Sequence, residues 1–245
     1  MQLANLPPWL NATLQNQIRQ TVVDQLAVDP LDRSSLDKAR QALEANPWIQ
    51  SIERIERTTT SVEVYAQYRV PAALVRMSNG CRLIDAQGVL LPGLYRARGY
   101  PVIEGVAVPA PHDGRPWPGP QIQAGLATAR LMASQPFAGQ IRGYDVSFRD
   151  DRNQPDPRGC IRVVLWTGEG RDPQRDPHVV WGLPPGQERT IEPDATVKLQ
   201  RLAEVQQACR SIDAGKRIVE IYGGATFVRQ PADDQSSPTR YTWVR

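Results

Sequence analysis

The sequence lacks a long apolar run, a secretion leader and any marked excess of one charge. No stretch approaches the roughly 18 apolar residues that a membrane span needs. The first residues, MQLANLPPWL, have neither the basic leader nor the continuous apolar core of a signal peptide. The 29 basic residues nearly balance the 26 acidic ones, and the arginines are scattered, unlike those of a nucleic-acid-binding surface. We therefore expect the chain as written to be soluble and to bind no nucleic acid.

Cysteine and histidine are also scarce. The three cysteines, Cys81, Cys160 and Cys209, form no CxxC pair, and their odd number does not fit a complete disulfide framework. We expect them to be small core residues. The two histidines, His112 and His178, are far apart in the sequence, and each follows a proline. Because a zinc site needs three or four ligands held together, we expect no metal site and no cofactor.

The motifs of common enzyme classes are absent too. The chain contains no GxSxG, no P-loop and no GxGxxG between a strand and a helix. Acidic loop residues such as Asp150, Asp151 and Glu169 are the remaining candidates for the catalytic residues of a hydrolase. An acid that stays in water is not tuned for proton transfer, so we interpret these residues as solvated surface. We expect no catalytic residue and a protein that is not an enzyme.

The first 70 residues read as two helices followed by strands. An amphipathic stripe recurs every fourth residue at Leu10, Leu14, Ile18, Val22 and Leu26. A second helix ends at Asn46-Pro47, because the residue before a proline avoids helical angles. Trp48 follows as a packing residue under the joint between this helix and a charged strand. Residues 60–68 alternate as a half-buried strand does. Two strands make a thin sheet, and QLANL near the N-terminus is the candidate for a third.

The rest of the chain mixes short strands with two helices. Strands are expected at AALVRM, at CRLID, near 141–149 and 160–166, at HVVWG, and on both sides of Gly223-Gly224. Helices are expected over 120–134 and from Pro193-Asp194, where proline suits the first turn. The Pro- and Gly-rich residues 100–120 are predicted to be a connecting segment. Residues 231–245, polar until Trp243, are predicted to be a mobile tail.

These ordered motifs resemble the extracytoplasmic part of FtsQ/DivIB, a family of bacterial cell-division proteins. The matching residues are Leu43, Asn46-Pro47-Trp48-Ile49, Arg57, Val62-Glu63-Val64, Val70-Pro71-Ala72, Leu83-Ile84-Asp85 and Gly88. In the second half, the short strand Val180-Trp181-Gly182, the helix over 194–212 and a final strand pair keep the family's order. The resemblance covers about residues 5–230.

The resemblance implies an α+β fold with two domains. A POTRA-like domain, two helices on a three-stranded sheet, would occupy residues 1–72. An FtsQ-type β-domain of antiparallel strands with flanking helices would occupy residues 73–230, followed by the mobile tail. Pro47, Trp48, Asp85 and Gly88 are assigned structural roles.

The resemblance also implies a non-enzymatic scaffold of the divisome, the cell-division machinery. Such a scaffold bridges septal membrane proteins, namely single-span coiled-coil proteins of the FtsB and FtsL type. It lies on the periplasmic face of the inner membrane and is anchored by a transmembrane helix upstream of residue 1. The implied partner contact is strand addition to the last exposed strand. The matching residues here are Tyr222, Gly223, Gly224, Ala225, Thr226, Phe227 and Val228. The structural alternative is a plain edge strand guarded by Lys216, Arg217 and Arg229.

Three positions depart from the family pattern. Thr58-Thr59 stand where the family has Trp-Pro, and Gln67 stands where it has Glu. Glu220-Ile221 replace its closing Asp-Leu-Arg strand.

Two other functions stay open: a chaperone-like POTRA module of outer-membrane assembly or secretion, and an α+β hydrolase that uses the loop acids.

Overall fold

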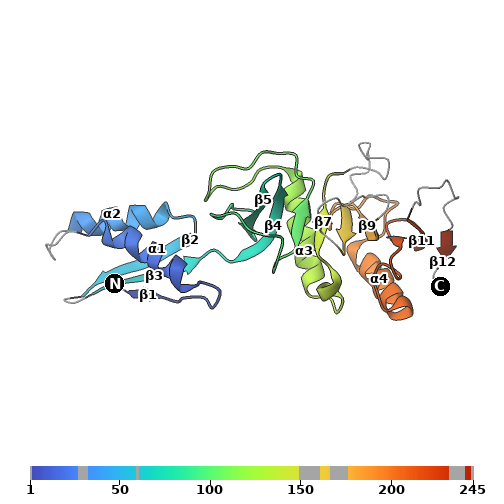
Figure 1. Ribbon diagram of the computed structural model, residues 1–245, viewed down its shortest axis with the longest axis horizontal. Coiled ribbons are helices and arrows are strands. Elements are labelled where there is room, and N and C mark those ends of the chain that lie inside the picture. The colour runs from blue at the N-terminus through green and yellow to red at the C-terminus, as the bar shows by residue number, and fades with distance from the viewer. Residues whose placement is uncertain are drawn as a thin grey trace.

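The chain has an α+β fold with two mixed β-sheets. The computed structural model describes residues 2–26, 33–58, 61–148, 161–165, 176–231 and 241–243. Within these ranges it contains four α-helices, one sheet of three strands and one of nine. This confirms the predicted fold class. The three-stranded sheet lies at one end of the long axis in Figure 1, and strand β12 (Tyr241–Trp243) lies at the other.

The N-terminal sheet has the strand order β1-β3-β2, with both helices inserted between β1 and β2 in sequence. Its elements are β1 (Gln2–Ala4), α1 (Ala12–Val23), α2 (Arg33–Glu44), β2 (Ile49–Arg57) and β3 (Val62–Tyr68). Strand β1 runs parallel to β3, and β2 runs antiparallel to it. The QLANL segment therefore supplies the third strand, as predicted.

Side-chain periodicity explains how this unit packs. The side chain of Asn11 caps α1 by accepting a hydrogen bond from the backbone N–H of Leu14, at 2.9 Å. Ile18 and Val22, one turn apart on α1, are fully buried. The predicted alternation of β3 is also present, since Val62, Val64, Ala66 and Tyr68 are all buried. These side chains form one hydrophobic cluster with those of both helices.

The second sheet has the order β12-β11-β10-β9-β8-β7-β6-β4-β5. Its other strands are β4 (Pro71–Met77), β5 (Gly80–Asp85), β6 (Val102–Glu104), β7 (Gly143–Asp145), β8 (Ile161–Val164), β9 (His178–Gly182), β10 (Ile218–Glu220) and β11 (Phe227–Arg229). The accompanying helices are α3 (Pro120–Ala133), a 3-10 turn (Ala138–Gln140) and α4 (Ala195–Cys209). Buried side chains of α3 and α4 share one core with this sheet, and both helices lie along it in Figure 1.

The pairing in this sheet differs from the expected antiparallel arrangement. Strand β6 pairs in parallel with both β4 and β7, and β10 pairs in parallel with β9. Parallel neighbours need a crossover connection, which is usually a helix. Helix α3 lies in the connection from β6 to β7, and α4 lies in the connection from β9 to β10. These two helices therefore supply the crossovers of the β6–β7 and β9–β10 pairs, whereas β4 reaches β6 through β5 and residues 86–101.

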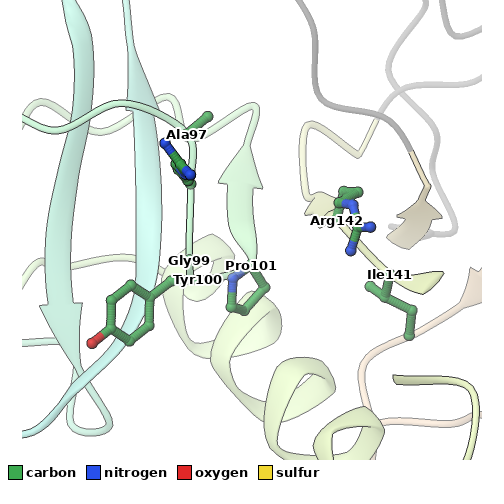
Figure 2. Close-up of a pocket in the computed structure, with 7 residues that line it drawn as sticks. Ala97, Gly99, Tyr100, Pro101, Ile141 and Arg142 are labelled. Atoms are coloured by element: carbon green, nitrogen blue, oxygen red, sulfur yellow. The ribbon is translucent and has the colours of Figure 1, made fainter. Parts of the chain in front are cut away.

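Residues 100–120 are more structured than a connecting segment. Val102–Glu104 form β6, which lies between β4 and β7 in the middle of the sheet, and Trp117 is buried in the core. Eight prolines and glycines over 105–120 obscure this short strand, because they dominate the local composition. The residues before β6 and β7 border a surface pocket of about 410 Å³ (Figure 2).

The C-terminal residues also depart from the predicted mobile tail. Tyr241–Trp243 form β12, which pairs antiparallel with β11 in the register Phe227↔Trp243 and Arg229↔Tyr241. Tyr, Thr and Trp all favour strands, so the residues themselves are suited to this pairing. The polar residues that precede β12 in the sequence make this short strand hard to predict.

The cysteines divide between core and surface. Cys81 is buried, and burial raises the pKa of its thiol, which fits the predicted core role. The same prediction is wrong for Cys209, which is exposed at the end of α4. Cys160 lies outside the described residues.

Within the described ranges, no helix combines the length and apolar character needed to cross a bilayer.

The two sheets meet between Tyr68 and Pro71, close to the boundary expected at residue 72. Arg69 donates a 2.9 Å hydrogen bond to Asp85, whose side chain is only 1% exposed. The second oxygen of Asp85 accepts the backbone N–H groups of Gln87 and Val89. Gly88 has a φ of +81° in this turn, a conformation that favours glycine. Asp85 and Gly88 thus have the geometry that their predicted structural roles require.

Trp48 packs on the N-terminal side of this joint. Its side chain is 5% exposed, and its ring lies 5.6 Å from that of Trp9. The backbone oxygen of Trp48 accepts a hydrogen bond from Arg69 N–H at 3.0 Å. A methyl group at Gly114 would touch Pro47, so the neighbouring loop also reaches this corner. The hydrophobic cluster that contains Trp48 includes Leu74 of β4, and therefore joins the two sheets.

We predict that Trp48→Ala lowers the free energy of unfolding by about 3–5 kcal/mol, the usual cost of removing a buried aromatic ring. Urea denaturation followed by circular dichroism measures this change. Trp48→Phe is the control and should lose much less, because most of the buried ring remains. Equal stability of Trp48→Ala and the wild type would show that Trp48 does not anchor the joint.

Candidate functional site

The two ends of the nine-stranded sheet differ in how much of their backbone is already paired. At one end, residues 91–95 cover the outer side of β5. Cys81 and Tyr95 exchange two backbone hydrogen bonds of 3.0 and 2.8 Å, and Leu91 N–H donates to Leu83 at 2.9 Å. At the other end, β12 pairs with β11 on its inner side, and no strand of the described residues pairs with its outer side. Within the described residues, the β12 end is therefore the open end of this sheet.

The predicted partner-binding residues lie next to this open end but do not form it. Strand β11, which contains Phe227 and Val228, pairs with β10 on one side and with β12 on the other. The prediction that it is the last exposed strand is wrong, because β12 covers its outer edge. Thr226 and Val228 are buried, whereas Gly224 is exposed in the turn that precedes the strand.

Arg201 of α4 holds this turn from the helix side. Its guanidinium donates to the backbone oxygens of Ile221 at 2.9 Å, Gly223 at 2.5 Å and Gly224 at 3.0 Å. Charge-assisted hydrogen bonds of this kind are stronger than neutral ones. Three carbonyls of the turn are therefore directed inward to one arginine, and the turn that links β10 to β11 is fixed to α4.

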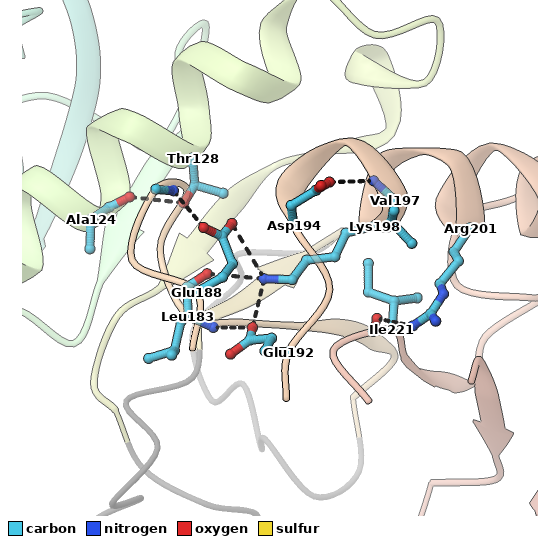
Figure 3. Close-up of polar contacts among 11 residues, drawn as sticks. Ala124, Thr128, Leu183, Glu188, Glu192, Asp194, Val197, Lys198, Arg201 and Ile221 are labelled. Carbon is cyan, nitrogen blue, oxygen red and sulfur yellow. Dashed lines mark hydrogen bonds and ion pairs between the residues drawn. The ribbon is translucent and has the colours of Figure 1, made fainter. Parts of the chain in front are cut away.

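Lys198 lies one turn earlier on α4 and fixes the loop that links β9 to α4. Its side chain is fully buried, and its ammonium group lies 2.6 Å from Glu192 and 3.7 Å from Glu188 (Figure 3). It also donates to the backbone oxygen of Leu183 at 3.4 Å and lies 5.0 Å from the Trp181 ring centroid. Glu192 in turn accepts the Leu183 N–H at 2.8 Å. A buried lysine needs such partners, because an unpaired charge in the core is costly.

Gly182, at the end of β9, allows the β9–α4 loop and the β10–β11 turn to pack closely together. Its φ is +97°, and a methyl group here would overlap both the Glu192 carboxylate and the Cβ of Tyr222. Only glycine satisfies both the backbone angle and this close approach. The loop that carries Glu192 and the turn that carries Tyr222 therefore pack against the same backbone position.

Sequence reasoning missed Lys198, Arg201, Glu192 and Gly182 as organising residues. A lysine and an arginine three positions apart on an amphipathic helix normally lie on its solvated face. Their partners are nearby in sequence for Lys198, but for Arg201 they lie about 20 residues later. The one available signal is the Val-Trp-Gly end of β9, where a glycine closes a strand of large residues.

The histidines and the loop acids are the residues that the sequence offered for chemistry. His112 is exposed, and the buried His178 has its Nδ1 2.8 Å from the backbone oxygen of Asp176. Among the residues that the structure describes, no three His, Cys, Asp or Glu side chains gather closely enough to hold a metal ion. Asp150, Asp151 and Glu169, the acids of the hydrolase alternative, lie outside the described ranges.

Comparison of the chain with protein-family models and with curated protein sequences finds no match. The geometry of the open end is thus the basis for assigning a function.

We predict that Glu192→Gln destabilises the protein by about 3–5 kcal/mol, because it leaves the buried ammonium of Lys198 without its nearest carboxylate. Adding Lys198→Met should recover most of this loss, since the methionine needs no charged partner. Denaturant unfolding of the two single variants and the double variant measures the coupling. The exposed pair of Arg40 and Glu44 provides a matched control, and Glu44→Gln should cost no more than about 0.5 kcal/mol. A double variant no more stable than Glu192→Gln would contradict this account.

We also predict that Arg201→Ala loosens the β10–β11 turn without unfolding the sheet. The three carbonyls then lose their donor, so amide hydrogen exchange over residues 221–226 should accelerate by about tenfold or more. Mass spectrometry of exchanged peptides measures this effect. Gln207→Ala, at an exposed position of the same helix, should leave the exchange unchanged. Unaltered exchange in Arg201→Ala would show that the turn is held by other contacts.

Proposed function

We propose that this chain is the extracytoplasmic part of a non-enzymatic cell-division scaffold of the FtsQ/DivIB type. It binds single-span membrane proteins of the FtsB and FtsL kind by accepting a partner strand at the open end of its nine-stranded sheet. The proposal includes a septal location on the periplasmic face and a transmembrane anchor encoded upstream of residue 1.

The observation that carries the proposal is the uncovered outer side of β12 within the described structure. An edge strand presents a row of unpaired backbone donors and acceptors, which an extended segment of another protein can pair with. In such strand addition, backbone hydrogen bonds supply affinity, and alternate side chains supply specificity. This contact replaces the β11 edge that the sequence alone suggested.

Two of the other strand edges are less suited to accepting a partner. The outer side of β5 is occupied by the chain's own residues 91–95. The free edge strand of the small sheet, β2, carries exposed Glu53, Arg54 and Glu56, and its pairing with β3 has two irregularities. Charges and bulges on an edge are typical devices against strand pairing. The remaining edge, β1, has the same length as β12, three residues, so length does not separate these two edges.

The fixed connections next to β12 are a second observation that supports this function. Lys198 and Arg201 hold the two connections that flank β9, β10 and β11. Strand β11, with which β12 pairs, therefore follows a fixed turn, and a rigid support loses little conformational entropy when a strand is added beside it. The N-terminal arrangement of two helices on a sheet ordered β1-β3-β2 agrees with the POTRA architecture that the resemblance implies.

We predict that a chain shortened after Pro231 loses partner binding, because β12 is removed. The loss should be about 100-fold or more in affinity, measured by calorimetry with detergent-solubilised FtsB- and FtsL-like proteins. The truncation also tests which strand, β11 or β12, accepts the partner. If β11 were the acceptor, its outer side would become free and binding would persist or strengthen.

Circular dichroism and thermal unfolding of the truncated chain control for loss of the fold. A second control is the full chain with Glu53→Ala on β2, which should bind as the wild type does. If the full-length chain captures no single-span division protein, and depletion of its gene leaves cell division normal, the scaffold function is wrong.

A further inference from the structure

The pocket beside β6 has walls from two segments that are distant in sequence. Residues 97–101 form one wall, and Ile141 and Arg142 form the other (Figure 2). Both walls are tied to the sheet. Arg142 accepts the Val102 N–H and donates its own to Val164, both at 2.9 Å. Leu74 N–H donates to Pro101, also at 2.9 Å. The pocket is therefore built on regular backbone pairing and not on a free loop alone.

The charge of this pocket is uncompensated. Its lining includes two exposed arginines, Arg98 and Arg142, and no acidic side chain. Neither guanidinium forms an ion pair in the part of the chain that the structure describes. Many other described arginines are paired with a carboxylate, namely Arg40, Arg54, Arg69, Arg76, Arg82, Arg162 and Arg229. Two unpaired arginines that share one pocket therefore create a local site for negative charge.

A backbone contact fixes part of this geometry. Arg142 donates one guanidinium hydrogen bond to the backbone oxygen of Gly139 at 2.8 Å, which orients its head group and leaves other donors available. Within the described residues, the N–H groups of Gly99 and Tyr100 donate to no protein atom. Gly99 has a φ of +83° and open space where a side chain would be. The wall around residue 99 thus stays low and accessible.

The lining also has an apolar part. Pro101, Ala97 and the buried Ile141 contribute carbon surface beside the two guanidinium groups. Arginine pairs with carboxylate and phosphate groups through two parallel hydrogen bonds. A volume of about 410 Å³ is within the range of small-molecule sites and exceeds what one inorganic oxyanion fills.

We propose that this pocket binds a small organic oxyanion, a phosphate ester or carboxylate attached to a compact apolar body. Arg98 and Arg142 hold the oxyanion, and Pro101 and Ile141 contact the apolar body. This inference does not depend on the proposed scaffold function, because the pocket and the β12 edge use different residues.

The test uses phenyl phosphate and inorganic phosphate as probes of the full chain, with binding followed by calorimetry and by NMR shifts. Phenyl phosphate should bind saturably and more tightly than inorganic phosphate, because only the ester has an apolar body. The double variant Arg98→Gln/Arg142→Gln should weaken phenyl phosphate binding by about tenfold or more, as expected for lost charge-assisted hydrogen bonds. Both arginines are exposed, so the fold should survive, which circular dichroism checks.

Arg96→Gln is the matched control. This arginine is exposed in the same segment but does not line the pocket, so its replacement should leave the affinity unchanged. An equal loss of affinity in Arg96→Gln would mean that the probe responds to general positive charge, which overturns the site. Absence of saturable binding to the wild type, or equal affinity for the two probes, would also overturn the proposal.

Discussion

The buried carboxylate of Asp85 is the contact on which the relation between the two sheets depends. One of its oxygens organises the turn after β5 through two backbone N–H groups, and the other binds Arg69 in the short link between the sheets. A carboxylate taken out of water needs all of these partners to offset its lost hydration. Because the side chain of Asp85 is only 1% exposed, these bonds hold the turn, the link and the end of β5 together away from water.

Two cations on α4 have a similar organising role at the far end of the molecule. Lys198 connects the β9–α4 loop to the helix, and Arg201 connects the β10–β11 turn to the same helix. Buried ionic groups contribute little to stability compared with well-packed apolar ones, but they tolerate few alternative arrangements. Their role here is geometric, since they fix the β9–α4 loop and the β10–β11 turn to one helix.

The sequence anticipates much of the fold where side-chain periodicity is strong. The stripe through Ile18 and Val22 and the alternation of β3 identify elements whose buried faces the structure contains. Short strands are harder to predict, because three residues carry too little pattern. Strand β6 was hidden by prolines and glycines, and β12 by the polar residues before it. Lys198 and Arg201 have the helical spacing of surface cations, and the partners of Arg201 lie about 20 residues later in the sequence.

The sequence by itself determined the helices, the longer strands and the packing role of Trp48, because these follow from local backbone preference and from the period of apolar residues. Only the tertiary structure decided which strand ends the sheet. That choice depends on pairing between segments that carry no mutual signal in sequence. The tertiary structure likewise brought Arg98 and Arg142 to one pocket, since β6 and the segment before β7 become neighbours only when the sheet forms.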